Sequence, residues 1–136
     1  MSKVTEQKYI EGLGRRKSAT ARVRITSAKE TQVIVNGKLM QEYFKHLAQQ
    51  LRIQEVLDTP EAGVEHYTIS VLVRGGGTSA QADAIRLGIA RALVGERSDR
   101  RSVLKKRGYL KRDPRAVERK KFGLRKARKR PAWSKR

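Results

Sequence analysis

Two stretches of the chain alternate between apolar and polar residues. In the first, residues 19–26, the apolar members are Ala19, Ala21, Val23 and Ile25. In the second, residues 64–74, they are Tyr67, Ile69, Val71 and Val73. A period of two is typical of a strand with one buried face, so both stretches are predicted as strands. Residues 8–13 and 32–35 are predicted as further strands, and Asn36-Gly37 forms a turn after the latter.

Apolar residues at helical spacing follow these strands. After the turn they fit one or two helices, and they are Leu39, Tyr43, Phe44, Leu47, Ala48, Leu51, Ile53, Val56 and Leu57. Thr78 and Gln81 have the spacing of a capping box, which predicts that a later helix begins at Thr78. Its apolar stripe is Ala82, Ile85, Ile89, Ala92 and Leu93. Gly95 is placed to end this helix, and a short basic helix is predicted between Ser98 and Gly108.

This order of elements predicts an α+β fold, a two-layer sandwich of a mixed four-stranded sheet with helices packed on it. The chain has 136 residues, which suits one compact domain with an appendage. Its formal net charge is +20, and residues 99–136 contain 18 Lys and Arg against 3 Asp and Glu. We therefore expect a globular body over residues 1–108 and an extended basic arm over residues 109–136.

The composition excludes several function classes. The chain has no cysteine, so it has no disulfide framework, thiolate metal site or cysteine nucleophile. Residues 1–10 have no apolar signal core and no run of about 18 apolar residues is present, so we expect a cytoplasmic protein without a membrane partner. His46 and His66 lie outside any cluster with metal-ligand spacing, and no nucleophile has a recognisable His/Asp relay. We expect no catalytic site, no metal and no cofactor.

The excess of basic residues points to a polyanionic partner, because a compact state with this charge must withstand strong self-repulsion. Three adjacent cations lie in a predicted turn over residues 14–18, and they are Arg15, Arg16 and Lys17. The glycine run 75–77 lies between a strand and a helix N-terminus, where it can hold a phosphate or simply make a tight turn. In the arm, single aromatic residues lie between short runs of cations, and they are Tyr109, Phe122 and Trp133. Flat side chains among cations favour folded RNA with unpaired bases.

Three stretches of the sequence, taken in order, resemble a known family. Residues 12–24 read Gly-Leu-Gly-Arg-Arg-Lys-Ser-Ala-Thr-Ala-Arg-Val-Arg, residues 75–93 open with Gly-Gly-Gly-Thr-Ser-Ala-Gln-Ala-Asp, and residues 112–128 contain Arg-Asp-Pro-Arg-Ala-Val-Glu-Arg-Lys-Lys-Phe-Gly-Leu. With the ending Ser134-Lys135-Arg136, they resemble bacterial ribosomal protein nine of the small subunit from about Tyr9 onward. The resemblance implies a place in the head of that subunit, contact with its ribosomal RNA and neighbouring head proteins, and a body like the second domain of ribosomal protein five. It also implies a left-handed β-α-β crossover, against the general rule.

The candidate RNA-binding residues are spread over the body and the arm. The set expected to bind ribosomal RNA is Arg15, Arg16, Lys17, Arg22, Arg24, Arg74, Gly75, Gly76, Gly77, Lys105, Lys106, Arg107, Lys111, Arg112, Arg115, Arg119, Lys120, Lys121, Arg125, Lys126, Arg128, Lys129 and Arg130. In the family the end of the arm approaches the anticodon stem-loop of peptidyl-site transfer RNA, which implies that contact for Ser134, Lys135 and Arg136. The chain departs from the family at Ala80 and Asp83, where the family usually or commonly has Gly.

Two alternatives stay open at this point. The glycine run between a strand and a helix is compatible with a small phosphotransferase, although no metal-binding acidic pair and no second lobe are evident. A basic tail is also compatible with a DNA-architectural protein. The leading prediction is a non-catalytic ribosomal component without a small-molecule substrate, in which Arg and Lys hold RNA phosphates.

Overall fold

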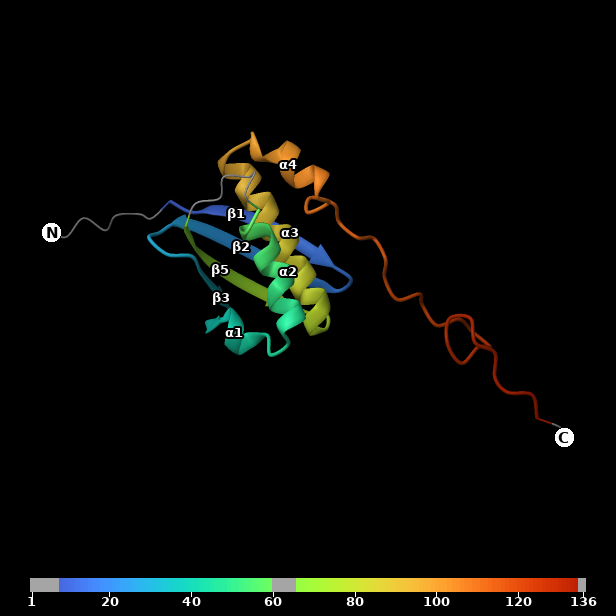
Figure 1. Cartoon of the computed structure of the whole chain (residues 1–136). Coiled ribbons are helices and arrows are strands. Elements are labelled where there is room, and N and C mark those ends of the chain that lie inside the picture. The colour runs from blue at the N-terminus through green and yellow to red at the C-terminus, as the bar shows by residue number, and fades with distance from the viewer. Residues whose placement is uncertain (1–7, 60–65, 135–136) are drawn as a thin grey trace.

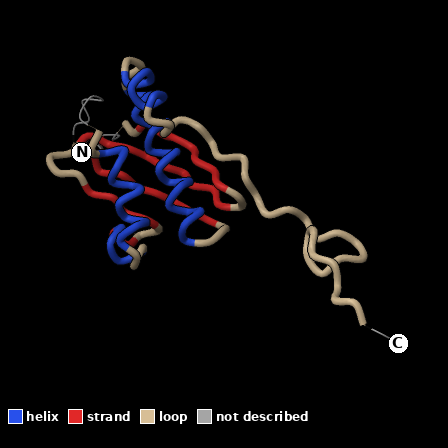
Figure 2. Tube along the Cα trace, turned by 45° about the vertical axis from the view of Figure 1, so that its right-hand side comes forward, coloured by secondary structure: helices blue, strands red, loops and turns tan. Residues whose placement is uncertain are grey.

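The structure is a computed structural model that describes residues 8–59 and 66–134. Its elements are β1 (Ile10–Arg16), β2 (Ala19–Ser27), β3 (Gln32–Val35), β4 (Lys38–Leu39), α1 (Met40–Tyr43), α2 (Leu47–Leu57), β5 (Tyr67–Arg74), α3 (Thr78–Glu96) and α4 (Arg100–Lys106). Helices lie over one face of a sheet, and the C-terminal segment leads away from it (Figure 1). The turned view shows the same two layers (Figure 2).

The sheet has the strand order β1-β2-β5-β3-β4, with antiparallel neighbours except for the parallel pair β3 and β5. A mixed sheet with helices packed on it confirms the predicted α+β class. The predicted number of four strands is wrong for the described residues, because β4 follows the Asn36-Gly37 turn as a fifth strand. With only two residues it is too short to produce an alternating pattern. The left-handed crossover stays a prediction, and residues 64 and 65, where the β5 pattern begins, lie outside the described residues.

The hairpin between β1 and β2 is tighter than the sequence indicates. β1 begins at Ile10 and continues to Arg16, which pairs with Ala19. The predicted turn over residues 14–18 is therefore reduced to Lys17 and Ser18, and Lys17 adopts a φ of 51°. Glycine is depleted in strands, which is why the sequence favours a turn at residue 14.

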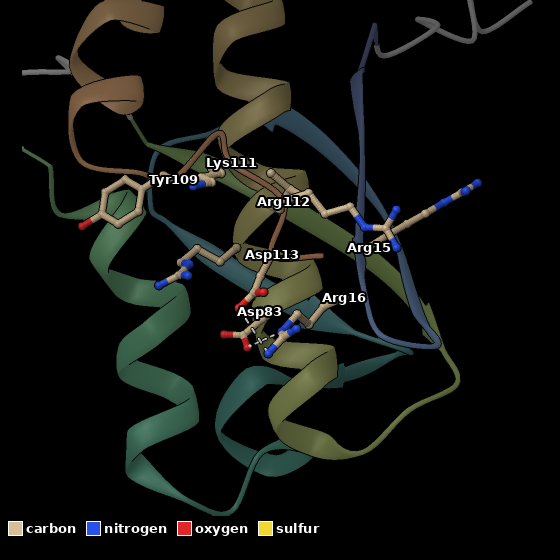
Figure 3. A pocket seen from close by; sticks show the side chains of 9 residues that line it. Arg15, Arg16, Asp83, Tyr109, Lys111, Arg112 and Asp113 are labelled. Carbon is tan, nitrogen blue, oxygen red and sulfur yellow. Dashed lines mark ion pairs between the residues drawn. The ribbon is translucent and has the colours of Figure 1, made fainter. Parts of the chain in front are cut away.

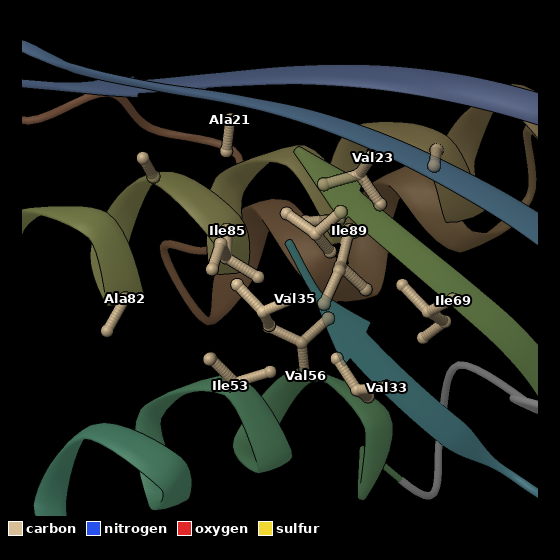
Figure 4. Packing of buried hydrophobic residues seen from close by; sticks show 14 of the residues in the cluster. Ala21, Val23, Val33, Val35, Ile53, Val56, Ile69, Ala82, Ile85 and Ile89 are labelled. Atoms are coloured by element: carbon tan, nitrogen blue, oxygen red, sulfur yellow. The ribbon is translucent and has the colours of Figure 1, made fainter. Parts of the chain in front are cut away.

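The core lies between the sheet and the helices. The alternating residues of β2 and β5 all face it, with at most 3% of their surface exposed. The predicted stripe of α3 is completely buried as well. Figure 4 shows how Val35 of β3 and Ile53 of α2 close this cluster against Ile85 of α3. The strand and α3 patterns are thus confirmed as the source of the core.

The helical pattern after residue 37 is only partly right. The chain breaks between α1 and α2, so a single periodicity drawn through both has the wrong phase for the second helix. Leu47 and Leu51 are 66% and 52% exposed, whereas α2 buries Gln49, Ile53, Val56 and Leu57. With Leu39 and Ala48, which are exposed as well, four of the nine apolar residues in the predicted helical pattern face solvent.

The helix α3 begins at Thr78, as predicted, but not through the predicted capping box. The residue that precedes the helix is Gly77, and Thr78 is already helical, so the capping box does not form. Gln81 instead donates from Nε2 to the backbone oxygen of Gly75 at 3.0 Å. Its Oε1 accepts a hydrogen bond from Tyr43 Oη at 2.7 Å, which joins the glycine run to α1. At the other end α3 continues one residue beyond Gly95, to Glu96, and the short basic helix α4 forms as predicted.

Glycine lets α3 lie directly on β1. A Cβ atom at Gly14 would overlap the backbone oxygen of Ala84 and lie 2.6 Å from the backbone nitrogen of Gly88. Gly12 faces the same helix one turn further along, against Gly88 and Ala92. Strand backbone and helix backbone are therefore in contact, which explains why β1 contains glycine.

We expect Gly14→Ala to lower the free energy of unfolding by about 3 kcal/mol, because the added methyl group overpacks a backbone contact that cannot move aside. Gly95→Ala is the matched control, since a Cβ there would lie 3.4 Å from Ile10 Cγ2, an ordinary contact. In α3 that change is neutral or stabilising by up to about 1 kcal/mol. Urea denaturation of both variants measures the difference, and equal stability of Gly14→Ala and the unmodified chain would contradict the packing.

Candidate nucleic-acid interface

Two of the predicted phosphate-binding segments meet where the C-terminal end of β5 lies beside the N-terminal end of β2. A Cβ atom at Gly75 would overlap the backbone oxygen of Ser18, and one at Gly76 would lie 3.0 Å from Ala19 Cβ. The glycine run therefore packs on the β1–β2 turn, next to Lys17. Gly75 and Gly76 have φ values of 75° and 65°, a conformation that glycine adopts without strain. The structure thus combines a cationic turn with the N-terminus of a 19-residue helix.

The face of the sheet opposite the helices carries further candidate arginines. Arg15 and Arg74 both lie beside Thr20 in the register of the sheet, and Arg22 and Arg24 follow along β2. Glu11 on β1 forms ion pairs with Arg22 and, at 3.9 Å, with Arg24. The hydrogen bond from Arg22 and the charges of both arginines lower the pKa of Glu11.

Arg16 has a different position from its neighbours. Its side chain is 12% exposed and reaches across to the start of the arm. Nη1 donates to the backbone oxygen of Arg115 at 2.7 Å, and Nη2 lies 3.3 Å from Asp113 Oδ2. Nε lies 3.5 Å from Asp83 Oδ2 on α3. Arg16 therefore joins β1, α3 and the arm.

We call this cluster of Arg16, Asp83, Asp113 and Arg115 the arm junction. Asp113 also accepts hydrogen bonds from the backbone N–H of Arg115 at 3.0 Å and from its guanidinium, with Nε at 2.9 Å and Nη2 at 2.7 Å. Arg52 of α2 lies 3.2 Å from Asp83. Figure 3 shows the guanidinium of Arg16 facing both carboxylates. These residues line a small pocket of about 50 Å³. A larger cavity of about 440 Å³ adjoins the junction. Its lining includes Arg16, Lys17, Arg52, Arg86 and Arg115, so it is predominantly cationic.

Hydrogen bonding strongly affects the acidity of Asp113. The guanidinium of Arg115 holds the pKa of this carboxyl well below its usual range, and the Arg115 backbone N–H and the charge of Arg16 act in the same direction. The carboxylate therefore remains ionised under all ordinary conditions. An ionised Asp113 keeps both guanidinium groups oriented at the start of the arm.

Two further contacts fix the direction in which the arm leaves the body. Arg100 at the start of α4 is almost completely buried, with Nη1 3.0 Å from Glu96 Oε2 and Nη2 3.1 Å from Tyr67 Oη. The guanidinium of Arg86 lies 5.7 Å from the centre of the Tyr109 ring. Tyr109, expected as a free stacking surface, is half-buried and packs on the core instead.

The chain beyond α4 contains no helix or strand over residues 107–134. It leads away from the body in both views (Figures 1 and 2). Near its start, Arg101, Lys105 and Lys111 border a groove of about 320 Å³. Phe122 and Trp133 are 104% and 85% exposed.

Exposure is common to almost all of the predicted RNA-binding residues. Of the set given above, Arg16 and Arg24 are half-buried, and all other members are exposed. In the predicted transfer-RNA contact, Ser134 is exposed, whereas Lys135 and Arg136 lie outside the described residues. Sequence reasoning missed Arg52, Arg100 and the role of Asp113. A carboxylate directly before proline within a cationic run was the available signal for Asp113; nothing in the sequence pattern singles out the other two.

Comparison with known proteins gives a consistent result. The family model described as ribosomal protein S9/S16 matches residues 14–136 of the chain. A curated protein of Synechocystis named small ribosomal subunit protein uS9 is 50% identical over 127 residues, which cover 92% of this chain and 90% of the relative. A protein of the same name from Gloeothece citriformis is 51% identical over the same shares of both chains. Among the described residues, no helix has the length and apolar character needed to cross a membrane.

We expect Asp113 to take up a proton only at a pH well below that of an ordinary aspartate, because its pKa is lowered in the folded state. The junction is then complete above the ordinary aspartate pKa and weakens only as the pH falls through the lowered value. Carboxyl-carbon NMR titration measures this directly. Arg115→Gln removes the main donor and should move the Asp113 inflection upward. The same inflection in both proteins would contradict the assigned cause.

Proposed function

Because this chain belongs to the ribosomal protein S9/S16 family, we propose that it is a component of the small ribosomal subunit and binds ribosomal RNA in the subunit head. Members of the family are structural ribosomal proteins and not enzymes, which answers the phosphotransferase alternative. The observation that carries the RNA-binding proposal is the exposure of the predicted cations, which are held outward by a rigid body and an open arm. This location makes the chain a cytoplasmic, ribosome-associated protein with neighbouring head proteins as further partners.

The body supplies a fixed phosphate-binding surface in this proposal. Lys17 and Arg15 lie at the end of the hairpin, and the glycine run beside them presents the N-terminus of α3. Backbone N–H groups and the positive end of a helix dipole favour a phosphate at such a place. The open face of the sheet extends this surface with Arg22 and Arg74. These contacts position the protein without reading the RNA sequence.

The arm, residues 109–136, supplies reach and charge. At about 3.3 Å per residue, roughly 90 Å is the upper limit of its reach, which only a fully extended chain would attain. Its cations neutralise phosphates along this path, while the exposed Phe122 and Trp133 offer ring surfaces to unpaired bases. At its end Ser134, Lys135 and Arg136 contact the peptidyl-site transfer RNA. The role of the chain is thus electrostatic and positional.

We expect the full chain to bind structured RNA more tightly than duplex DNA at matched, moderate salt, because the exposed rings have no unpaired base to meet in a duplex. If about ten phosphates are neutralised, log K falls with log salt with a slope of about −7 to −9. Fluorescence anisotropy with a looped RNA and a DNA duplex of equal length measures both quantities. A preference for DNA would support the DNA-architectural alternative instead.

We expect deletion of residues 134–136 to leave co-sedimentation with small subunits intact while weakening transfer RNA in the peptidyl site. The loss is about tenfold in affinity, which corresponds to about 1.4 kcal/mol of phosphate contacts. Filter binding of transfer RNA to purified subunits carrying the full or the shortened chain makes the comparison. Unchanged transfer RNA affinity in the shortened subunits would refute the role of the tip.

A further inference from the structure

Glu118 is the one carboxylate in the last 23 residues of the sequence, which contain 11 Lys and Arg. In an arm that binds a polyanion, a negative charge weakens binding by repulsion unless it has another role. The contacts of Glu118 therefore need an explanation.

Glu118 closes a loop in the arm. Its Oε1 pairs with Lys121 Nζ, and its Oε2 accepts a hydrogen bond from Arg128 Nε at 3.0 Å. Between Glu118 and Lys129, the backbone N–H of Arg125 also donates to the backbone oxygen of Lys129 at 2.8 Å. We call residues 118–129 the arm loop. It stands away from the sheet in both views (Figures 1 and 2).

The backbone of the arm loop has a conformational requirement of its own. Gly123 has a φ of 76°, and a Cβ there would meet nothing within 4 Å. Next to it, the N–H of Leu124 donates to the oxygen of Lys121 at 3.2 Å. Glycine is therefore needed for the turn and not for space. Two independent features therefore determine the shape of the loop. They are the ion pairs of Glu118 and the left-handed backbone conformation of Gly123.

Phe122 projects from this turn with its whole side chain in water, 104% exposed. Full exposure of a large apolar ring is unfavourable in the free protein. Cations within four residues of Phe122 in the sequence are exposed as well, and they include Arg119, Lys120, Arg125 and Lys126. A flat ring among cations is the arrangement that binds an unpaired base between its neighbouring phosphates.

We propose that the arm loop is a preformed RNA-binding site, in which Phe122 stacks on an unpaired base and Glu118 is the positioning residue that keeps the loop closed. The inference rests on the proposed RNA-binding function and makes it specific for one segment. Closing the loop before binding reduces the ordering cost that a fully open arm would meet. Glu118 thus favours RNA binding although its charge repels RNA.

The Glu118→Gln variant distinguishes a positioning role of Glu118 from the simple effect of its charge on RNA binding. Removal of a negative charge predicts tighter RNA binding, whereas opening of the loop predicts binding that is weaker by about three- to fivefold. The measurement uses the full chain and an RNA hairpin with a single-stranded loop near physiological salt. Glu30→Gln is the matched control, because it removes one exposed carboxylate from the body between β2 and β3. Affinity of Glu118→Gln equal to or above that of Glu30→Gln would overturn the role of Glu118.

Gly123→Ala tests the loop shape without changing any charge. An alanine at positive φ opposes the turn, so this variant should also lose about three- to fivefold in RNA affinity. In both variants the amide of Arg125 should exchange its hydrogen faster in the free protein, while Glu118→Asp restores part of the protection. Unchanged exchange at Arg125 in both variants would show that neither residue holds the loop.

Stacking by Phe122 has its own readout. A 2-aminopurine placed in the hairpin loop should lose fluorescence when the unmodified chain binds, and should keep it with Phe122→Leu. Phe122→Leu should bind at least about fivefold more weakly, since base stacking contributes about 1–3 kcal/mol per base. Phe122→Tyr should bind normally, and Val117→Ala controls for loss of another exposed apolar residue of the arm. Equal quenching by Phe122→Leu and the unmodified chain would overturn the stacking role.

The outcomes separate the two proposals. If the unmodified chain fails to bind the hairpin, both the proposed function and the arm-loop site are wrong. If it binds and the Glu118, Gly123 and Phe122 variants bind equally well, the RNA-binding function stands and the arm-loop site is wrong.

Discussion

Direct contact between the backbones of α3 and β1 determines where the charged residues of this protein lie. Gly12 and Gly14 leave no side chain between strand and helix, so α3 is held along β1. As a result the first turns of α3 lie beside the end of the β1–β2 hairpin. Asp83 meets Arg16 there, and the glycine run meets Ser18. A backbone packing constraint thus places the ionic contacts and the proposed phosphate-binding surface.

Carboxylates of the body and of the arm loop share one physical role. Glu11 pairs with Arg22, Asp83 and Asp113 both pair with Arg16, and Glu118 pairs with Arg128. Each fixes a flexible cationic side chain in one orientation, and this reduces the side-chain entropy that is lost when a phosphate binds. A few negative charges in a strongly basic protein are therefore compatible with a polyanionic partner, provided that they orient cations.

The sequence predicts those parts of the fold in which one periodicity runs without interruption. The alternation in β2 and β5 and the stripe of α3 depend on local pattern and come out correctly. The phase of α2 does not, because the break after α1 resets the helix. The arm junction needs the register of β1 against α3, which is a long-range property. Arg16 therefore looks like its neighbour Arg15 in the sequence but has a different environment. Most candidate site residues are surface cations, which composition alone can identify.

The position of β5 affects the order in which the molecule is made. This strand lies between β2 and β3, so the sheet stays in two separate pieces until residue 74 has been synthesised. The arm comes later in the chain than every element of the sheet and than α3. Because domains acquire structure from the N-terminal side as they emerge, the body can reach its native packing while the arm, with 13 of the 33 Lys and Arg residues, is still inside the ribosome. Collapse of the body is thereby separated in time from the attraction of the arm to nucleic acid.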